Sequence, residues 1–163
     1  MRRLVLMRHA KSSWDNPALD DHDRPLNKRG KRSAKALGDW LRAKTIVVDQ
    51  ALVSSAARTV ETLQRLNVKC DREILDELYH ADPDDMFRIL RGATGQTVLM
   101  LGHNPGISWF ASDLVADPPD HPRFDDYPTG ATLVARFDID DWSELATGTG
   151  QCQAFVVPRE LTG

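Results

Sequence analysis

In Leu4-Val5-Leu6-Met7-Arg8-His9-Ala10-Lys11, a short apolar run ends abruptly in an arginine and a histidine. An apolar run of this length, bounded by polar residues, predicts a buried strand of a parallel sheet. Arg8 and His9 would then lie at the carboxyl end of that strand, where open α/β sheets bind their ligands. A guanidinium beside an imidazole at such a place indicates chemistry on an anion, and a phosphoryl group suits that pair best.

Outward from this strand, apolar strand patterns alternate with helical ones. We expect strands over residues 3–8, 51–53, 73–75, 97–101, 131–137 and 152–157, the third of them edge-like. We expect helices over residues 27–43, after the N-capping hydroxyls of Ser54 and Ser55, from Pro83, after Pro105, and a short one over 141–145. The proline-rich residues 117–130 predict a loop. This order predicts an α/β fold, a three-layer αβα arrangement with a mostly parallel sheet, as a single domain over residues 1–163.

Composition and charge set limits on the function. The 163 residues suffice for one domain with a sizeable core, and a net charge of −3 gives no reason to expect nucleic-acid or membrane partners. Cys70 and Cys152 lie far apart and have no metal-ligand spacing. We expect two small buried side chains in a reducing compartment rather than a disulfide.

The start of the chain imitates a signal peptide only briefly. Two arginines precede an apolar stretch, but Arg8 and His9 interrupt it after four residues, which is too short for the apolar region of a signal. No apolar run approaches the ~20 residues that cross a bilayer. These features predict a cytoplasmic protein.

Three strands end in residues suited to phosphate. The first ends in Arg8-His9, the second in Ser54-Ser55-Ala56-Ala57-Arg58, and the third in Gly102-His103-Asn104. Parallel strands present their carboxyl ends at one edge of a sheet. We therefore expect the three ends to converge on one pocket.

Four motifs carry a resemblance to a known family. They are LMRHAKSSW at residues 6–14, DRPLNKRG at 23–30, SSAART at 54–59 and GHNP at 102–105. In this order the chain resembles the histidine phosphatase superfamily, with the phosphoglycerate-mutase-like fold, and most of all the small SixA-type phosphohistidine phosphatases. Ala10 departs from the pattern, since the superfamily more often has glycine there; a small residue is retained, so the backbone can still approach a phosphate closely.

The resemblance implies roles for individual residues. The histidine matching His9 would attack phosphorus and form a covalent phosphohistidine. Arg8 and Arg58 would bind the non-bridging oxygens and favour the neutral form of His9, and His103 would complete the clamp. Contacts with phosphate or the leaving group are expected from Lys11, Ser12, Ser13 and Asn104. The cationic side chains would replace a metal or organic cofactor, so we expect neither.

The general acid is the least determined part of the site. The superfamily often takes a carboxylic acid from the region after the third strand, and Glu77 fits that place best. Asp82 and, more remotely, His80 are alternatives. A phosphorylated histidine as substrate would relax the requirement, because its ring leaves readily once it is protonated.

Other side chains have structural interpretations. We expect Asp23 and Arg24 to form an ion pair that holds their loop, and the tryptophans at 14, 40, 109 and 142 to serve packing. The five histidines show no metal-ligand spacing, so a metal site is not predicted.

The function expected on these grounds is a phosphatase acting through His9. The expected substrate is a phosphohistidine in a signalling protein, because no long insertion could fold over the pocket as a lid. A phosphatase of a small phosphorylated metabolite remains an alternative. A phosphoglycerate-mutase-type phosphotransferase and a non-catalytic phosphate-binding module on the same fold are further alternatives.

Overall fold

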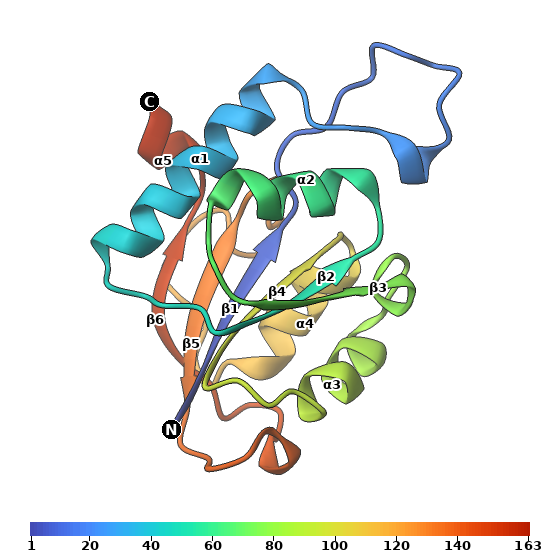
Figure 1. Ribbon diagram of the computed structural model, residues 1–163. Helices are drawn as coiled ribbons and strands as arrows, with labels where there is room; N and C mark the ends of the chain where they lie inside the picture. Colours follow the sequence, from blue (N-terminus) through green and yellow to red (C-terminus); the bar gives the residue numbers. More distant parts are fainter.

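A six-stranded sheet forms the centre of the computed structural model, which describes residues 1–163 (Figure 1). The strands lie in the order β3-β2-β4-β1-β5-β6. Their bounds are β1 Arg2–Arg8, β2 Gln50–Ser54, β3 Asp71–Leu75, β4 Thr97–Gly102, β5 Thr132–Phe137 and β6 Gln151–Val156. β3 is an edge strand with little burial, as its short mixed sequence predicts.

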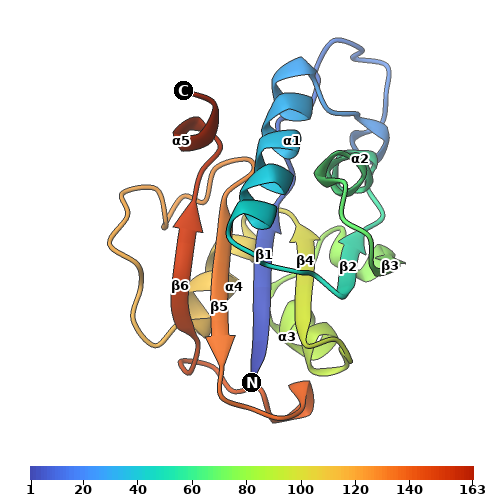
Figure 2. The ribbon, with the colours of Figure 1, turned by 60° about the vertical axis from the view of Figure 1, so that its left-hand side comes forward.

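Helices cover both faces of the sheet. α1 (Lys28–Ala43) and α2 (Ala57–Leu66) lie on one face, and α3 (Pro83–Arg91) and α4 (Gly106–Leu114) lie on the other (Figures 1 and 2). The short α5 (Arg159–Thr162) packs beside α1. The expected three-layer α/β architecture is therefore present, and the expected element bounds agree within one or two residues.

The direction of the strands decides which residues meet. β1, β2, β3 and β4 pair in parallel, whereas β5 is antiparallel to both of its neighbours. Because two reversals restore the original direction, β6 again runs parallel to β1. The carboxyl ends of β1, β2, β4 and β6 therefore share one edge of the sheet, and α5 follows β6 at that edge (Figure 2).

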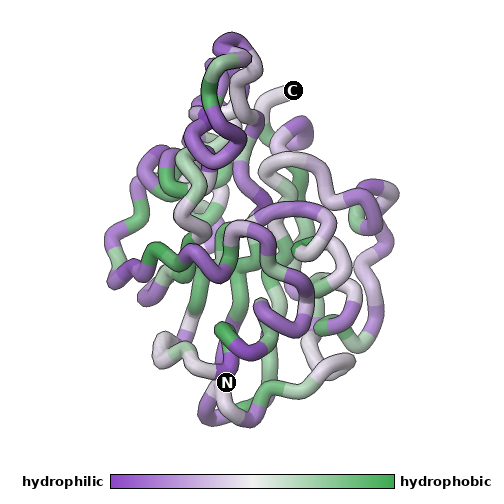
Figure 3. The backbone as a smooth tube through the Cα atoms, turned by 90° about the vertical axis from the view of Figure 1, so that its right-hand side faces the viewer, coloured by the Kyte–Doolittle hydropathy of each residue, from purple (hydrophilic) through white to green (hydrophobic).

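Two apolar cores hold the layers together. Leu4, Leu6 and Met100 face α3 and α4, whereas the alternate residues Val5 and Met7 face α1 and α2, as the two-residue period of a strand requires. Figure 3 shows hydrophobic segments running through the middle of the molecule with hydrophilic ones around them. The strands that end at this shared edge of the sheet are thus buried on both faces, which fixes the position of the residues that follow them.

The helix starts follow local capping chemistry. The side chain of Asn27 accepts a hydrogen bond from the Gly30 amide, and Asp82 and Asp85 form a capping box at the start of α3. The expected cap of α2 is wrong: Ala56 precedes that helix and makes no side-chain cap. Ser54 is instead the last residue of β2, where its hydroxyl accepts from the Ala56 amide.

Cys70 and Cys152 are unpaired and only half-buried, so the expectation that both side chains are buried is wrong. No helix combines the length and the apolar character that crossing a bilayer requires.

Candidate active site

The site is built at the shared edge of the three central parallel strands. His9 follows β1, Ser54 ends β2, and His103 follows β4. Arg58 lies in the first turn of α2 and points back to the same place, because its guanidinium contacts both histidines. The convergence that the sequence predicts is therefore present for these residues.

His9 is held in one tautomer by its own backbone. Its Nδ1 lies 2.7 Å from the carbonyl oxygen of Ala10, which can only accept, so Nδ1 carries the hydrogen. Nε2 is therefore unprotonated, and its lone pair accepts a long hydrogen bond of 3.4 Å from Nε of Arg58. His9 is only 6% exposed, so a ligand that reaches Nε2 has to take the place of this hydrogen bond.

The surroundings keep His9 neutral. The pKa of His9 is lowered from its ordinary 6.5 to about 3, mainly by burial and to a lesser extent by His103, Arg8 and Arg58. The hydrogen bond to Ala10 acts in the opposite direction and is outweighed. A neutral imidazole with one unprotonated nitrogen is the form that nucleophilic attack requires.

Arg58 is oriented by a carboxylate from a distant loop. Its Nη1 donates to the backbone oxygen of Asp21 at 2.8 Å, and its Nη2 donates to the Asp21 carboxylate at 3.1 Å. Nη2 also lies 3.3 Å from Nδ1 of His103. With 7% of its surface exposed, Arg58 is a fixed donor group, not a mobile surface charge.

Asp21 joins three side chains from different parts of the chain. Besides Arg58, its carboxylate accepts from the Tyr79 hydroxyl at 2.6 Å and from Nη1 of Arg24 at 2.8 Å. The Tyr79 hydrogen bond, followed by Arg58 and Arg24, holds the pKa of Asp21 well below its usual range. Asp21 therefore stays ionised and fixes the position of both arginines.

His103 is the second neutral imidazole. Arg58 can only donate, so Nδ1 of His103 accepts, and Nε2 carries the hydrogen that it donates to the Ser54 hydroxyl at 2.8 Å. Burial, followed by the charge of Arg58, lowers the pKa of His103 to about 3. Its ring centroid lies 5.2 Å from that of His9.

Arg8 brings an unsatisfied donor to the site. Its Nη1 donates to the Tyr127 carbonyl at 3.2 Å, but its buried Nε has no hydrogen-bond partner. Asn104 donates to the same carbonyl at 3.0 Å, and its buried Oδ1 is also unpartnered. Buried polar atoms are rarely left unpaired, so these atoms indicate a place for a polar ligand.

Two adjoining hollows give access to these groups. The first, of about 240 Å³, is lined by Arg8, His9, Lys11, Ser12, Trp14, Arg24, Arg58, His103, Asn104 and Thr129. The second, of about 360 Å³, shares Arg58, His103 and Asn104 with the first. No group of three or more His, Cys, Asp or Glu side chains is arranged to hold a metal ion.

Comparisons with known proteins agree with this geometry. Residues 4–82 match the model of the histidine phosphatase superfamily (branch 1). A SixA-type phosphohistidine phosphatase candidate from Nakamurella multipartitia is 32% identical, covers 96% of both chains and superposes with a TM-score of 0.85. The chain belongs to the histidine phosphatase superfamily. It is a phosphatase.

Further relatives of this histidine phosphatase span most of its length. An uncharacterised protein of Mycobacterium tuberculosis (strain H37Rv) is 34% identical over 94% of this chain and 100% of its own. The phosphohistidine phosphatase SixA of Escherichia coli (strain K12) is 27% identical over 69% of this chain and 73% of its own. A protein histidine phosphatase SixA complexed with tungstate shares the fold, with a TM-score of 0.79 at 24% identity and coverage of 98% and 99%.

The expected binding residues of the histidine phosphatase divide into two groups. Lys11, Ser12 and Asn104 line the first hollow. Ser13 does not: its hydroxyl accepts from the Asp15 amide and its carbonyl accepts from Arg24. Ser12 is engaged as well, because its hydroxyl accepts from Nη2 of Arg24.

The structure does not bring Glu77 to either hollow. Glu77 is exposed in the short 3-10 turn Asp76–Leu78 and makes no hydrogen bond or ion pair there. His80 and Asp82, the two alternatives, both line the second hollow. The carboxylate of Asp82 is occupied in capping α3, whereas the ring of His80 stacks against Tyr79 at 4.0 Å between centroids.

Two structural expectations are wrong. Arg24 pairs with Asp21 and not with Asp23, which lies instead 3.6 Å from His22. The tryptophans also divide: Trp142 is buried, but Trp14 and Trp109 are 70% and 57% exposed, and each lines one of the two hollows. Arg24 stacks on Trp14 at 3.3 Å, which explains how an aromatic ring is held in an exposed loop.

Sequence reasoning missed Asp21 and Tyr79. Asp21 precedes Arg24 by three residues, and this spacing is the only local sign of their pairing. Nothing in the local sequence connects either residue with Arg58, which lies 37 positions from Asp21. Their contact results from the loop that follows β1 and projects beyond the sheet edge (Figure 1).

Proposed function

We propose that this phosphatase removes a phosphoryl group from phosphohistidine in a protein, with His9 as the nucleophile. The observation that carries the proposal is the unprotonated Nε2 of His9, fixed by the hydrogen bond from Nδ1 to Ala10, in a residue that lines a hollow together with Arg8 and Arg58. Its only partner is the long hydrogen bond from Arg58, which a bound phosphoryl group would replace. An unprotonated imidazole nitrogen beside two guanidinium groups suits attack on a bound dianion.

The reaction proceeds in two balanced steps. In the first, Nε2 of His9 forms a bond to phosphorus while the phosphorus–nitrogen bond of the substrate breaks, and the departing imidazole takes up a proton from the general acid or from solvent. In the second, water attacks phosphorus, the bond to Nε2 breaks, and inorganic phosphate leaves as the water returns a proton to the same acid or to solvent. Arg8 and Arg58 stabilise the charge on the equatorial oxygens in both steps.

His103 has a conditional role in this scheme. In the unliganded site its pKa is low because burial and Arg58 disfavour the charged form. A phosphoryl dianion beside the ring acts in the opposite direction and raises that pKa. His103 then shares the transferred charge with Arg8 and Arg58, while Lys11 and Asn104 contact the phosphate or the leaving group from the wall of the hollow.

Support for a protein-borne substrate comes from the rim. Trp14 and Trp109 are exposed beside the two hollows, and large aromatic side chains with arginines are enriched where proteins bind each other. A small metabolite would be expected to need a more enclosed site.

The decisive experiment traps the intermediate and ranks the substrates. Brief incubation with a radiolabelled phosphohistidine protein should place an alkali-stable, acid-labile label on His9. The label should be absent in His9→Ala and retained in the matched control His121→Ala, whose ring contacts Glu160 away from the hollows. Phosphoester turnover that exceeds phosphohistidine turnover would overturn the substrate assignment. Retention of the label in His9→Ala would overturn the nucleophile.

A separate pair of variants tests the general acid. We propose that the acid comes from residues 77–82, where Glu77 matches the family position and His80 lines the hollow. His80→Gln and Glu77→Gln should be compared on one phosphoester and one phosphohistidine substrate. An acid should lower phosphoester turnover by about 10²-fold or more and phosphohistidine turnover much less. Unchanged turnover of both substrates in a variant removes that residue.

A further inference from the structure

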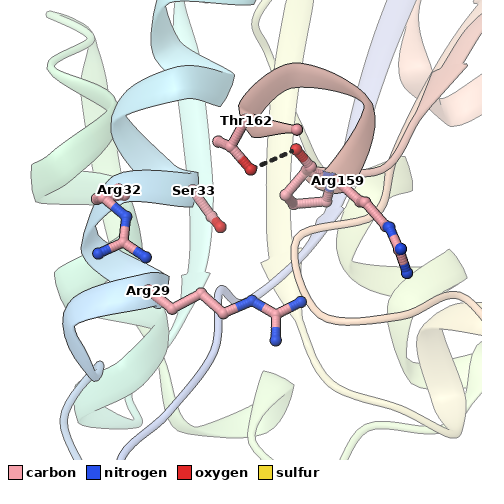
Figure 4. Close-up of a pocket in the computed structure, with 7 residues that line it drawn as sticks. Arg29, Arg32, Ser33, Arg159 and Thr162 are labelled. Atoms are coloured by element: carbon pink, nitrogen blue, oxygen red, sulfur yellow. Dashed lines mark hydrogen bonds between the residues drawn. The ribbon is translucent and has the colours of Figure 1, made fainter.

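A basic groove lies beside the first hollow and is not used by the mechanism above. It consists of two adjoining spaces of about 250 and 300 Å³, which share Arg29, Ser33, Pro158 and Arg159. It runs between the start of α1 and α5, and Figure 4 shows Arg29 extending from α1 into the gap while Arg159 projects from the opposite wall. Its lining is mostly polar and charged, with Pro128, Val157 and Pro158 as the apolar side chains.

The groove is continuous with the active site. Lys11 and Thr129 line both its nearer space and the first hollow. The start of α1 packs directly on the backbone of the loop after β1, where a β-carbon at Gly30 would lie 2.1 Å from the Lys11 carbonyl oxygen, so the groove is held close to the first hollow. Because the two spaces share Lys11 and Thr129, a ligand whose phosphoryl group reaches His9 can extend past Lys11 into the groove.

Four of the five cations that line the groove lack internal partners, whereas Arg123 is paired with Asp126. Arg29, Arg32 and Arg159 are exposed, and their side chains make no hydrogen bond or ion pair. Lys11 is partly buried, and its side chain also makes no hydrogen bond or ion pair. The acids that adjoin the groove along the chain are already engaged, Asp126 with Arg123 at 2.8 Å and Glu160 with His121 at 2.7 Å. The positive charge of the groove is therefore available to a ligand.

The sequence of α1 places positive charge at the N-terminal end of the helix, where cations are electrostatically unfavourable. Residues 28–35 contain five lysines and arginines, and the first turn of α1 contains no acid. Cations at a helix N-terminus oppose the helix dipole, and like charges three or four residues apart repel. A bound anionic partner would reverse both effects.

We propose that this groove binds an acidic segment of the phosphorylated protein, next to the phosphohistidine that enters the first hollow. The proposal rests on the function proposed above. The groove offers only Pro128, Val157 and Pro158 as apolar surface for a small metabolite, and no aromatic side chain on which a nucleobase would stack. An acidic polypeptide needs neither, because exposed carboxylates can pair with exposed arginines through hydrated contacts.

The test compares two phosphohistidine peptides that differ only in their flanks, one rich in Asp and Glu and the other carrying Asn and Gln instead. The ratio of their kcat/KM values should favour the acidic peptide by about tenfold at low salt and approach unity at high salt. Arg29→Glu and Arg159→Glu should each abolish the preference. The matched control Lys69→Glu, an exposed lysine outside the groove, should retain it. Equal use of both peptides by the unmodified protein would overturn the proposal.

A binding measurement separates this proposal from the proposed function. Fluorescence anisotropy with the acidic peptide lacking phosphate reports on the groove without catalysis. Binding that Arg29→Glu weakens about tenfold and Lys69→Glu does not supports the groove, even if phosphohistidine proves not to be the substrate. Equal weakening in both variants would overturn it, as would tighter binding of a single-stranded oligonucleotide of equal charge. Phosphohistidine turnover without any flank preference would overturn the groove and leave the proposed function standing.

Discussion

The first hollow and the groove beside it carry the same kind of charge in opposite ways. Arg58 in the hollow is 7% exposed, and every part of its guanidinium is held by Asp21, His9 or His103. In the groove, Arg29, Arg32 and Arg159 are exposed, and their side chains make no hydrogen bond or ion pair. A buried, fixed arginine acts through geometry and resists salt, whereas exposed ones act through long-range attraction that salt screens.

The difference indicates a division of labour between the two regions. Burial lowers the pKa of His9 and His103 and keeps both imidazoles neutral. Burying such polar side chains reduces the stability of the fold, and proteins retain them where the chemistry requires neutral imidazoles and fixed donors. The exposed groove costs the fold little, because water solvates its cations. Variants in the two regions should therefore differ in the size of their effect and in their response to salt.

The largest expected effect is that of Arg58→Ala. It removes the guanidinium that we propose binds the transferred phosphoryl group, so kcat should fall by about 10²–10³-fold. The loss should change little between low and high salt, since the contact is buried. Steady-state kinetics at two ionic strengths checks this, with Arg65→Ala, an exposed residue of the same helix, as the matched control. Full recovery of activity in low salt would contradict the assignment of Arg58 to the buried machinery.

Lowering the pH should destabilise the folded protein through the two buried histidines. Their folded-state pKa of about 3 lies below the unfolded value near 6.5, so the unfolded state binds more protons between these values. The stability is complete above pH 6.5 and falls as the pH is lowered. Together the two groups change the unfolding constant by up to about 10²-fold per pH unit.

Urea unfolding at pH 7.5, 6 and 5 measures this dependence before most carboxylates titrate. His103→Gln should remove about half of the slope. Identical slopes in the variant and the unmodified protein would show that the buried rings are not its source.

Asp21→Asn should reduce turnover by a smaller amount, about tenfold, because the asparagine keeps one oxygen acceptor for Arg58 but loses the charge. Asp21 positions Arg58 and does not contact the phosphoryl group, so kcat should change more than KM. Tyr79→Phe, which removes only the hydroxyl donor to Asp21, should have a weaker effect in the same direction. An Asn variant with normal kcat would show that Arg58 is positioned without the carboxylate.

The smallest effect should come from Arg32→Ala in the groove. With one of several exposed cations removed, kcat/KM on an acid-flanked phosphopeptide should fall about two- to fivefold at low salt. The difference should disappear at high salt, in contrast to that of Arg58→Ala. A loss that persists in high salt would place Arg32 among the fixed groups and remove the distinction between the two regions.

Much of this architecture is predictable from the sequence, because local patterns determine it. The run before Arg8, the strand before Ser54 and the strand before Gly102 each end in polar residues, and parallel pairing brings these ends together. Asp21 is different. No local pattern distinguishes Asp21 from Asp15, Asp20 and Asp23 as a partner of Arg58, and only the path of their loop selects the one that reaches it.

Two other features depended on tertiary contacts that no local pattern records. A tryptophan usually serves packing, but Trp14 remains at the rim because Arg24 stacks on it and Asp21 fixes Arg24. Glu77 has the sequence position of a family acid, yet the 3-10 turn after β3 directs this segment so that His80 and Asp82 line the hollow.

The carbonyl of Ala10 gives His9 a spectroscopic signature that does not depend on any substrate. Nitrogen NMR of the resting protein should find Nδ1 with a bound hydrogen and Nε2 as a pyridine-type nitrogen across the neutral range. Because the tautomer is selected by the backbone itself, side-chain substitutions around the hollow should leave this signature intact even where they abolish turnover. The readiness of the nucleophile and the efficiency of the reaction can thus be observed separately.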